Sequence, residues 1–186
     1  MMVMTAELNR VASNNPAPPA VVFRRTSMFM YEGSHMGDSM NTLRSTGYKE
    51  LDRFCDLDRQ PHAKDFISGG SLEVHQRDFV RDDTCYLSIV DADNGLLGYF
   101  LLIVEDDGKT INFHRIVIDQ KAQGVGQLAI KQMEEFCRLD LGATNIWLDV
   151  FEDNPRGIHI YEKLGFRRFK SEPYNQRVLH FYRKTL

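Results

Sequence analysis

Two short turn sequences in the middle of this chain separate three strand-like segments. Residues 93–95 read Asp-Asn-Gly and residues 106–108 read Asp-Asp-Gly, and such sequences close tight antiparallel hairpins. The segments that they join, residues 85–92, 97–105 and 110–119, are rich in β-branched, aromatic and other apolar residues. The pattern predicts an antiparallel meander of three strands, which argues against a parallel dinucleotide-binding sheet in this region.

Helix-like and strand-like segments alternate on both sides of the meander. Residues 125–139 carry apolar residues at spacings of three and four, which predicts a helix packed by one face on a sheet. Residues 145–151 are β-branched and aromatic enough for a buried strand, so a β-α-β unit is embedded here. The order predicts an α+β fold with a mixed, mostly antiparallel central sheet flanked by helices. The other predicted elements are a strand at 41–45, helices at 48–57, 71–79 and 156–164, and strands at 166–170 and 177–183.

The first forty residues differ from the rest of the chain. The sequence at residues 14–19, Asn-Asn-Pro-Ala-Pro-Pro, cannot continue a helix or a strand. We therefore expect an N-terminal extension outside the core at residues 1–40 and one folded domain at residues 41–186. A short strand within residues 21–32 is the one element that this extension could add. The full length of 186 residues leaves no room for two enzyme domains.

Charge, cysteine and histidine content narrow the class of protein. The formal net charge is −3 and the basic residues are scattered, which argues against a nucleic-acid partner and weakly favours a cationic small molecule. Three cysteines without a Cys-x-x-Cys pair, and six histidines without ligand spacing, indicate reduced thiols and no metal site. Each histidine is expected to be a surface or locally hydrogen-bonded residue. No signal peptide and no stretch of about 18 apolar residues is present, so we expect a cytoplasmic protein without a membrane partner.

A glycine-rich sequence, Gln-Gly-Val-Gly-Gln, occupies residues 123–127 between a predicted strand and the long helix. Backbone N–H groups at such a turn, together with the helix N-terminus, form a seat for a phosphate or pyrophosphate. Two glycines in this place are also common as plain turn and packing residues. A Walker loop is excluded because no Gly-Lys-Ser/Thr follows, and a Rossmann fingerprint would need Ala129 to replace its third glycine.

Two further groups could carry chemistry. Asp149 lies in a strand that is otherwise fit for burial, where an ionised carboxylate is costly unless it is paired or faces a cleft. The alternative is a strand-end carboxylate that faces water. Tyr161 lies on the apolar face of the helix at 156–164, and the alternative there is a core tyrosine with one satisfied hydrogen bond. Asn154 is a plausible N-cap of this helix, and Gly165 ends it.

Together, these features resemble the GNAT superfamily of N-acetyltransferases over residues 43–183. The glycine sequence is similar to the acetyl-CoA loop of that family, Gln/Arg-x-x-Gly-x-Gly/Ala after a strand. Residues 154–166 resemble its later motif, Asn-x-x-Ala-x-x-x-Tyr-x-x-x-Gly-Phe, with Gly157 in place of the alanine. The strand around Asp149 is most similar to the branch that contains ribosomal-protein and small-amine acetyltransferases.

The resemblance implies a GNAT-like fold, acetyl-CoA as cosubstrate and no metal. It also implies acetyl transfer to a primary amine by direct attack, with a small or peptide amine as the acceptor and a homodimer as one candidate assembly. In this interpretation Asp149 takes a proton from the amine and Tyr161 protonates the departing thiolate. The residues implied for binding acetyl-CoA are Ile116, Val117, Ile118, Gln123, Gly124, Val125, Gly126, Gln127 and Asn154.

Two other classes of function stay open from the sequence. A non-catalytic acyl-CoA-binding regulatory module would keep the glycine loop but would not need Asp149 and Tyr161 to converge on one thioester. A nucleotide-binding redox domain would bind a nicotinamide cofactor, and the antiparallel meander disfavours it.

Overall fold

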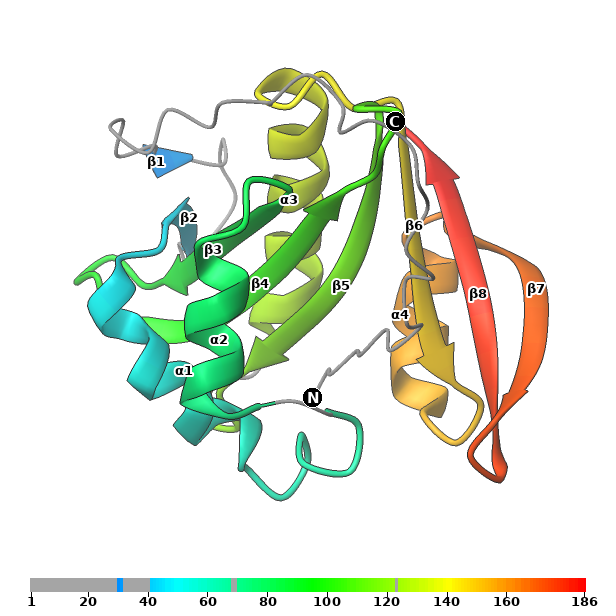
Figure 1. The fold of residues 1–186 in the computed structure, drawn as a ribbon, viewed down its shortest axis with the longest axis horizontal. Coiled ribbons are helices and arrows are strands. Elements are labelled where there is room, and N and C mark those ends of the chain that lie inside the picture. Colours follow the sequence, from blue (N-terminus) through cyan, green and yellow to red (C-terminus); the bar gives the residue numbers. More distant parts are fainter. Residues whose placement is uncertain (1–29, 32–40, 68–69, 123) are drawn as a thin grey trace.

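The computed structural model describes residues 30–31, 41–67, 70–122 and 124–186 of the chain. These residues form one eight-stranded sheet with the strand order β1-β2-β3-β4-β5-β6-β8-β7, covered by helices (Figure 1). The strands are β1 (Met30–Tyr31), β2 (Thr42–Ser45), β3 (Thr84–Val90), β4 (Leu96–Val104), β5 (Thr110–Ile118), β6 (Asn145–Phe151), β7 (Arg167–Tyr174) and β8 (Arg177–Thr185). The helices are a 3-10 turn (Tyr48–Glu50), α1 (Leu51–Asp58), α2 (Leu72–Phe79), α3 (Val125–Leu139) and α4 (Pro155–Lys163).

The predicted meander is confirmed. Strands β3, β4 and β5 pair antiparallel in sequence order. Asn94 in the first connecting turn and Gly108 in the second adopt positive φ angles of 61° and 65°, the conformation that Asn and Gly tolerate best. The predicted α+β class and the embedded β5-α3-β6 unit are also confirmed, because β6 is parallel to β5 and the other strand pairs are antiparallel.

The sheet divides between β5 and β6. Only three residue pairs join the two strands, and the last of them is Asn112 with Trp147. Beyond this pair the strands diverge into a V, which separates β1–β5 from β6–β8 (Figure 1). Polar backbone groups in the interior need partners, so a sheet that opens in its middle is able to accept another extended chain there.

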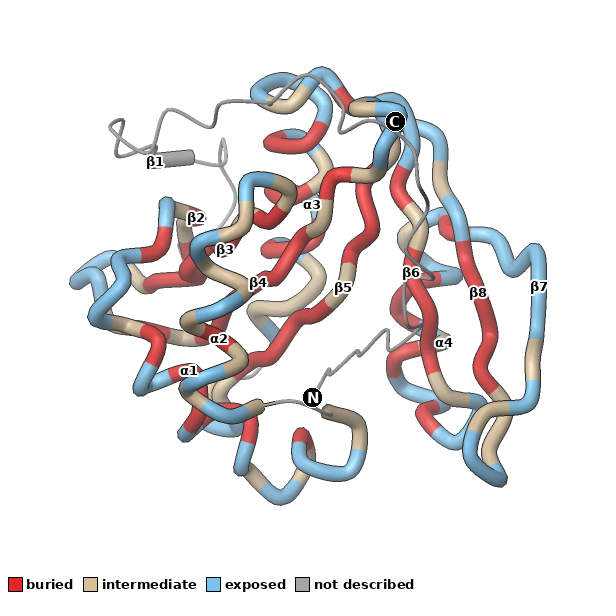
Figure 2. Tube along the Cα trace, viewed as in Figure 1, coloured by how far each residue is buried: buried red, intermediate tan, exposed pale blue. Residues whose placement is uncertain are grey.

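Helices cover the two faces of the sheet unequally. Helices α1 and α2 cover one face of β3–β5, where an apolar cluster gathers around Phe54 and Tyr99. Helices α3 and α4 cover the opposite face, where a larger cluster around Phe113 and Met133 is continuous across both halves of the sheet. The buried residues follow the inner strands, whereas β7 at the sheet edge is exposed along most of its length (Figure 2).

The N-terminal segment contributes at least one short strand. Met30–Tyr31 pairs antiparallel with β2 and extends the sheet at its edge. The rest of the expected extension, residues 1–29 and 32–40, lies outside the described residues, so the domain boundary near residue 40 stays a prediction. Among the helices that the structure describes, none is both long and apolar enough to cross a membrane.

Candidate active site

The C-terminal half of β5 lines one side of the opening in the sheet. Ile116, Val117 and Ile118 are buried and pair with β4, but no β6 residue pairs with them. Gly98 of β4 lies opposite Ile118, and a Cβ atom at Gly98 would lie 2.3 Å from the Val117 carbonyl oxygen. Glycine is therefore needed for the close approach of these two strands. One edge of β5 is therefore not paired with a strand over the three residues that the family resemblance assigned to acetyl-CoA binding.

The glycine sequence opens helix α3. Gly124 is the N-cap residue with φ +84°, and a Cβ atom there would meet nothing within 4 Å. Val125, Gly126 and Gln127 form the first helical turn, which has no side-chain cap and no acidic residue. The first N–H groups of a helix have no intrahelical partner, and this turn therefore offers them, with the positive end of the helix dipole, to an anion. Gln123 lies outside the described residues.

Helix α4 carries Tyr161 onto the sheet. Asn154 caps the helix, because its Oδ1 accepts a hydrogen bond from the Gly157 N–H at 3.0 Å. Tyr161 is fully buried and lies edge-on against Phe113 and Phe166 at ring-centroid distances of 6.1 and 6.0 Å. Its hydroxyl has no hydrogen-bond partner in the part of the chain that the structure describes. Tyr161 is therefore not the core tyrosine with one satisfied hydrogen bond that the sequence offered as the alternative.

Asp149 lies in the interior of β6, opposite Phe181 of β8. The residue is fully buried, and neither carboxylate oxygen finds a hydrogen-bond partner within the described ranges. The alternative of a strand-end carboxylate facing water is therefore wrong. Burial raises the pKa of Asp149 well above its usual range. Burial also raises the pKa of Tyr161, and the charge of Asp149 raises it further.

Two polar residues of β5 that the sequence did not single out share this property. Asn112 is buried with Oδ1 unpartnered, and His114 is half-buried with Nδ1 inaccessible and unpartnered among the described residues. We expected every histidine to be a surface or locally hydrogen-bonded residue. This expectation is wrong for the Nδ1 atom of His114. The signal in the sequence was a pair of polar residues, two apart, that alternate with the apolar Ile111 and Phe113. We call Asn112, His114, Asp149 and Tyr161 the unpaired cluster.

A second buried polar group lies under α1 and α2, where the side chains hydrogen-bond to one another. Asp58 accepts hydrogen bonds from Tyr99 Oη at 2.6 Å and Arg115 Nη1 at 3.2 Å, and its Oδ2 lies 3.0 Å from His75 Nε2. The other ring nitrogen of His75 lies 3.0 Å from Tyr86 Oη. These residues fasten both helices to β3, β4 and β5. We call Asp58, His75, Tyr86, Tyr99 and Arg115 the paired cluster.

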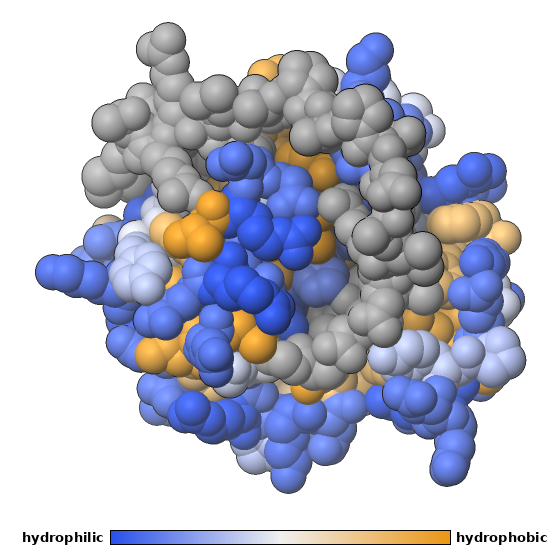
Figure 3. Space-filling view, viewed as in Figure 1, coloured by the Kyte–Doolittle hydropathy of each residue, from blue (hydrophilic) through white to orange (hydrophobic). Residues whose placement is uncertain are grey.

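The loop between α1 and α2 bridges the two halves of the sheet. At the end of β5, His62 Nε2 lies 3.1 Å from the Ile118 carbonyl oxygen. On the other half, Arg177 of β8 donates to the Asp65 carbonyl oxygen at 3.1 Å. The guanidinium carbon of Arg177 also lies 3.5 Å from the ring centroid of Phe151. This contact holds the guanidinium in place for its hydrogen bond to Asp65. In the space-filling view of this face, apolar surface is confined to separate patches between hydrophilic side chains (Figure 3).

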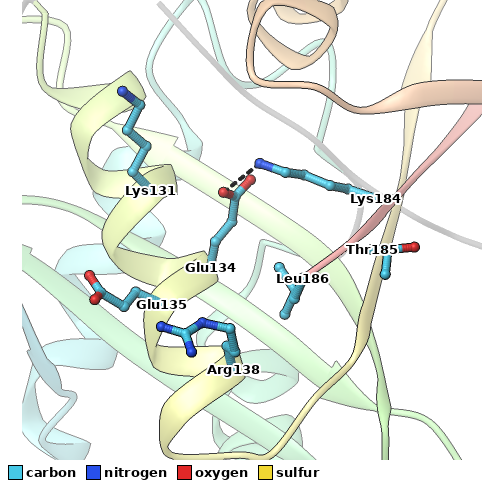
Figure 4. A pocket seen from close by; sticks show the side chains of 7 residues that line it. All are labelled: Lys131, Glu134, Glu135, Arg138, Lys184, Thr185 and Leu186. Carbon is cyan, nitrogen blue, oxygen red and sulfur yellow. Dashed lines mark hydrogen bonds and ion pairs between the residues drawn. The ribbon is translucent and has the colours of Figure 1, made fainter.

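A pocket outlined by described residues lies elsewhere. It has a volume of about 320 Å³ and is open to solvent between α3 and the end of β8, where Lys184 donates to Glu134 at 2.7 Å (Figure 4). None of the predicted site residues lines it. Within the described ranges there is also no group of three or more side chains that could hold a metal ion.

Comparison with known proteins decides the family. The sequence profile of the Acetyltransferase (GNAT) family matches residues 51–166. The chain belongs to the GNAT family of acetyltransferases. It is thus an N-acetyltransferase, as the sequence motifs predicted, and members of this family use acetyl-CoA as cosubstrate.

The chain is similar to GNAT proteins from Bacillus subtilis and Vibrio cholerae. "Uncharacterized N-acetyltransferase YdgE" of Bacillus subtilis (strain 168) is 24% identical over an alignment of 147 positions, which covers 67% of this chain and 90% of that protein. A single-residue variant of spermidine N-acetyltransferase SpeG from Vibrio cholerae superposes with a TM-score of 0.67 at 19% identity, over 78% of this chain and 93% of that one. A chimera of SpeG with hSSAT gives 0.69 at 19% identity, over 78% and 95%. The likeness to the solved structures shows that the fold is the GNAT fold.

The residues of this GNAT chain fit acetyl-CoA on structural grounds. The free edge of β5 can pair with an amide-bearing chain, the uncapped first turn of α3 can hold an anion, and the unpartnered hydroxyl of Tyr161 lies buried behind the opening in the sheet. The predicted binding residues therefore lie on two elements that meet at one end of the opening. Asn154 is engaged in capping α4, and its assignment to acetyl-CoA stays a prediction.

Proposed function

We propose that this enzyme transfers the acetyl group of acetyl-CoA to a small primary amine by direct attack of the amine, with Asp149 and Tyr161 as the catalytic residues. The observation that carries the proposal is the pair of buried, unpartnered and electrostatically coupled groups beside the opening between β5 and β6. A non-catalytic acyl-CoA-binding module would have no need for such a pair, because unsatisfied buried polar groups destabilise a fold.

Acetyl-CoA supplies an acetyl group activated as a thioester. Ile116, Val117 and Ile118 would bind its pantetheine arm through their backbone, as an added strand in the opening. The N–H groups at residues 123–127 would bind its pyrophosphate. A net charge of −3 does not prevent binding of the pyrophosphate, because local backbone dipoles and not the overall charge form the binding site.

Asp149 would prepare the amine. An aliphatic amine has a pKa of about 10 and arrives as an ammonium ion, which must lose a proton before its lone pair can attack. The carboxylate of Asp149 attracts the cation, and its raised pKa makes it a stronger proton acceptor than an ordinary aspartate. The proton therefore moves from the amine nitrogen to Asp149, directly or through a water molecule.

Tyr161 would hold the proton needed by the departing sulfur. Its raised pKa keeps the phenol protonated at neutral pH, and its hydroxyl has no competing partner in the described structure. Burial among Phe113 and Phe166 fixes the ring so that the hydroxyl keeps one position. Such a positioned acid contributes typically about 10²–10⁴-fold to a rate.

The loop between α1 and α2 supports a small acceptor over a large one. It is anchored at Ile118 on one half of the sheet and at Arg177 on the other, and so narrows the approach on this side of the opening. The printed names of the structural neighbours, which are spermidine N-acetyltransferases, point to the same class. The free cysteines of the described residues agree with the cytoplasmic location that we propose for the enzyme.

Thiol release from acetyl-CoA across a panel of polyamines, aminoglycosides, amino acids and peptides with a free N-terminus tests this function. We expect turnover with at least one small primary amine, and we expect Tyr161→Phe to lower kcat by about 10²–10⁴-fold with unchanged binding of acetyl-CoA. Binding of acetyl-CoA without turnover of any amine would show that the protein is the regulatory module instead. Unchanged kcat in Tyr161→Phe would remove this residue from the mechanism.

A further inference from the structure

Three members of the unpaired cluster present hydrogen-bonding atoms without partners from one face of the sheet. Asn112 Oδ1, His114 Nδ1 and both oxygens of Asp149 lack partners among the described residues. Two further unpartnered buried atoms, His62 Nδ1 and Glu134 Oε1, belong to side chains that already make a bond through their other polar atom. Four unpartnered buried atoms on three side chains therefore flank the opening, and such groups in a native fold call for an explanation.

The register of β5 and β6 places these side chains around the opening. Asn112 is the last β5 residue paired with β6, and its partner is Trp147. Side chains two residues apart on a strand point to the same face. Two residues beyond this last pair stand His114 on β5 and Asp149 on β6, so they face the same side and flank the opening where the strands begin to separate.

A bulge in β5 frees His114 from the strand ladder. Phe113 pairs with Leu102 and Arg115 pairs with Leu101, which leaves His114 as the extra residue without a partner on β4. Phe113 packs against Tyr161 on the α4 side, while Arg115 bonds to Asp58 on the α1 side. A β-bulge re-aims a side chain in this way and is common next to active sites.

The imidazole of His114 stays neutral over the physiological pH range. Burial and the nearby guanidinium groups of Arg115 and Arg81 lower the pKa of His114 to about 3. A neutral imidazole has one N–H and one lone pair, so His114 can accept a hydrogen bond without adding a positive charge that would repel a cation. Asn112 is neutral as well, and Asp149 supplies the negative charge.

We propose that Asn112, His114 and Asp149 together bind the amino group of the acceptor, with His114 Nδ1 accepting a hydrogen bond from the amine N–H. The inference rests on the proposed function and extends it to Asn112 and His114, which neither the family motifs nor the sequence analysis assigned to the site. A primary ammonium group has three N–H donors and no acceptor, and three acceptor side chains on one face match it. The site therefore selects a primary amine over its N-methylated derivative, which has one donor fewer.

Substitutions at His114 test whether its Nδ1 atom accepts a hydrogen bond from the amine. His114→Phe keeps the ring volume but removes the acceptor, and we expect kcat/KM for the best amine of the panel to fall by about 10–100-fold, the range for a hydrogen bond to a charged group. The KM for acetyl-CoA and the melting temperature should be unchanged. His114→Asn should recover more activity than His114→Gln, because the amide of Asn reaches the place of Nδ1 and that of Gln the place of Nε2.

A matched control and a matched substrate pair sharpen the test. His180 is a buried strand histidine on β8 whose nitrogens lie 2.9 Å from Ser171 Oγ and 3.3 Å from Arg168 Nη1, and His180→Asn should leave kcat/KM within about threefold. Wild-type enzyme should prefer the primary amine to its N-methyl derivative, and His114→Phe should reduce that preference.

The outcomes separate this inference from the proposed function. A wild-type enzyme that acetylates no amine overturns both. A wild-type enzyme that turns over an amine, together with equal kcat/KM in wild type and His114→Phe, overturns the role of His114 alone. If His114→Phe does not fold, equal activity of the Asn and Gln variants overturns it in the same way.

Discussion

The paired cluster and the unpaired cluster are both buried and polar, and they adjoin each other on β5, yet they differ in how their side chains are hydrogen-bonded. In the paired cluster, Asp58 contacts Tyr99, Arg115 and His75 at 2.6 to 3.2 Å. In the unpaired cluster, Asn112, His114, Asp149 and Tyr161 keep polar atoms without partners in the described structure. Arg115 and His114 are neighbours in sequence but belong to different clusters.

The difference shows which buried groups stabilise the fold and which are kept for a ligand. Satisfied polar networks specify and rigidify a core, whereas each unsatisfied group costs about 1–3 kcal/mol. A fold keeps the second kind where function requires it. The paired cluster thus fastens α1 and α2 to the sheet, and the unpaired cluster is the one that we propose to meet the acetyl donor and the amine.

Removal of the central carboxylate of the paired cluster has the largest expected effect. Asp58→Asn removes the buried ion pair between Asp58 and the guanidinium of Arg115, and breaking a buried pair in this way costs about 3–5 kcal/mol. Urea unfolding should show this loss. A loss below about 1 kcal/mol would mean that the cluster is not a structural unit.

A pair of identical substitutions, one in each cluster, sharpens the comparison. Tyr99→Phe removes the 2.6 Å hydrogen bond to Asp58 and should lower the free energy of unfolding by about 1.5–3 kcal/mol. Its acetyl-transfer rate, measured well below the melting temperature, should stay near that of wild type. Tyr161→Phe should lower the acetyl-transfer rate and leave the free energy of unfolding nearly unchanged. The hydroxyl that it removes has no hydrogen-bond partner in the described fold. Equal losses of stability in the two variants would contradict the distinction.

Replacement of Asp149 should give a smaller, pH-dependent gain in stability. The folded-state pKa of Asp149 lies above its unfolded value of about 3.9, so this group favours folding below pH ~3.9, and that contribution is lost as the pH rises through the folded-state pKa. Asp149→Asn removes the titration. Its melting temperature should therefore match that of wild type near pH 4 and exceed it at neutral pH, where each kcal/mol corresponds to about 2–4 °C.

Calorimetry across this pH range measures the effect, and thiol release measures the accompanying loss of acetyl transfer. A melting temperature of Asp149→Asn that runs parallel to that of wild type at all pH values would show that the Asp149 carboxyl has its ordinary pKa in the fold.

The local elements of this chain were predictable because their signals are local. The spacing of apolar residues predicted a helix at residues 125–139, and α3 has these bounds. Asn154 with Pro155 marked the start of α4. The turn residues placed the hairpins of the meander. The motifs identified Asp149 and Tyr161 as candidates, but not whether either one is paired, because hydrogen-bond partners come from segments distant in sequence.

The sequence by itself determined the order of the elements, the α+β class and the GNAT family, since periodicity, turn chemistry and motif spacing are written along the chain. Only the tertiary structure decided that β5 and β6 separate after Asn112, that the Asp149 carboxylate is buried and unpartnered among the described residues, and that a bulge leaves His114 without a pairing residue on β4. The physical reason is that burial, register and hydrogen-bond satisfaction depend on contacts between remote segments, whereas a linear pattern specifies only which face of an element is apolar.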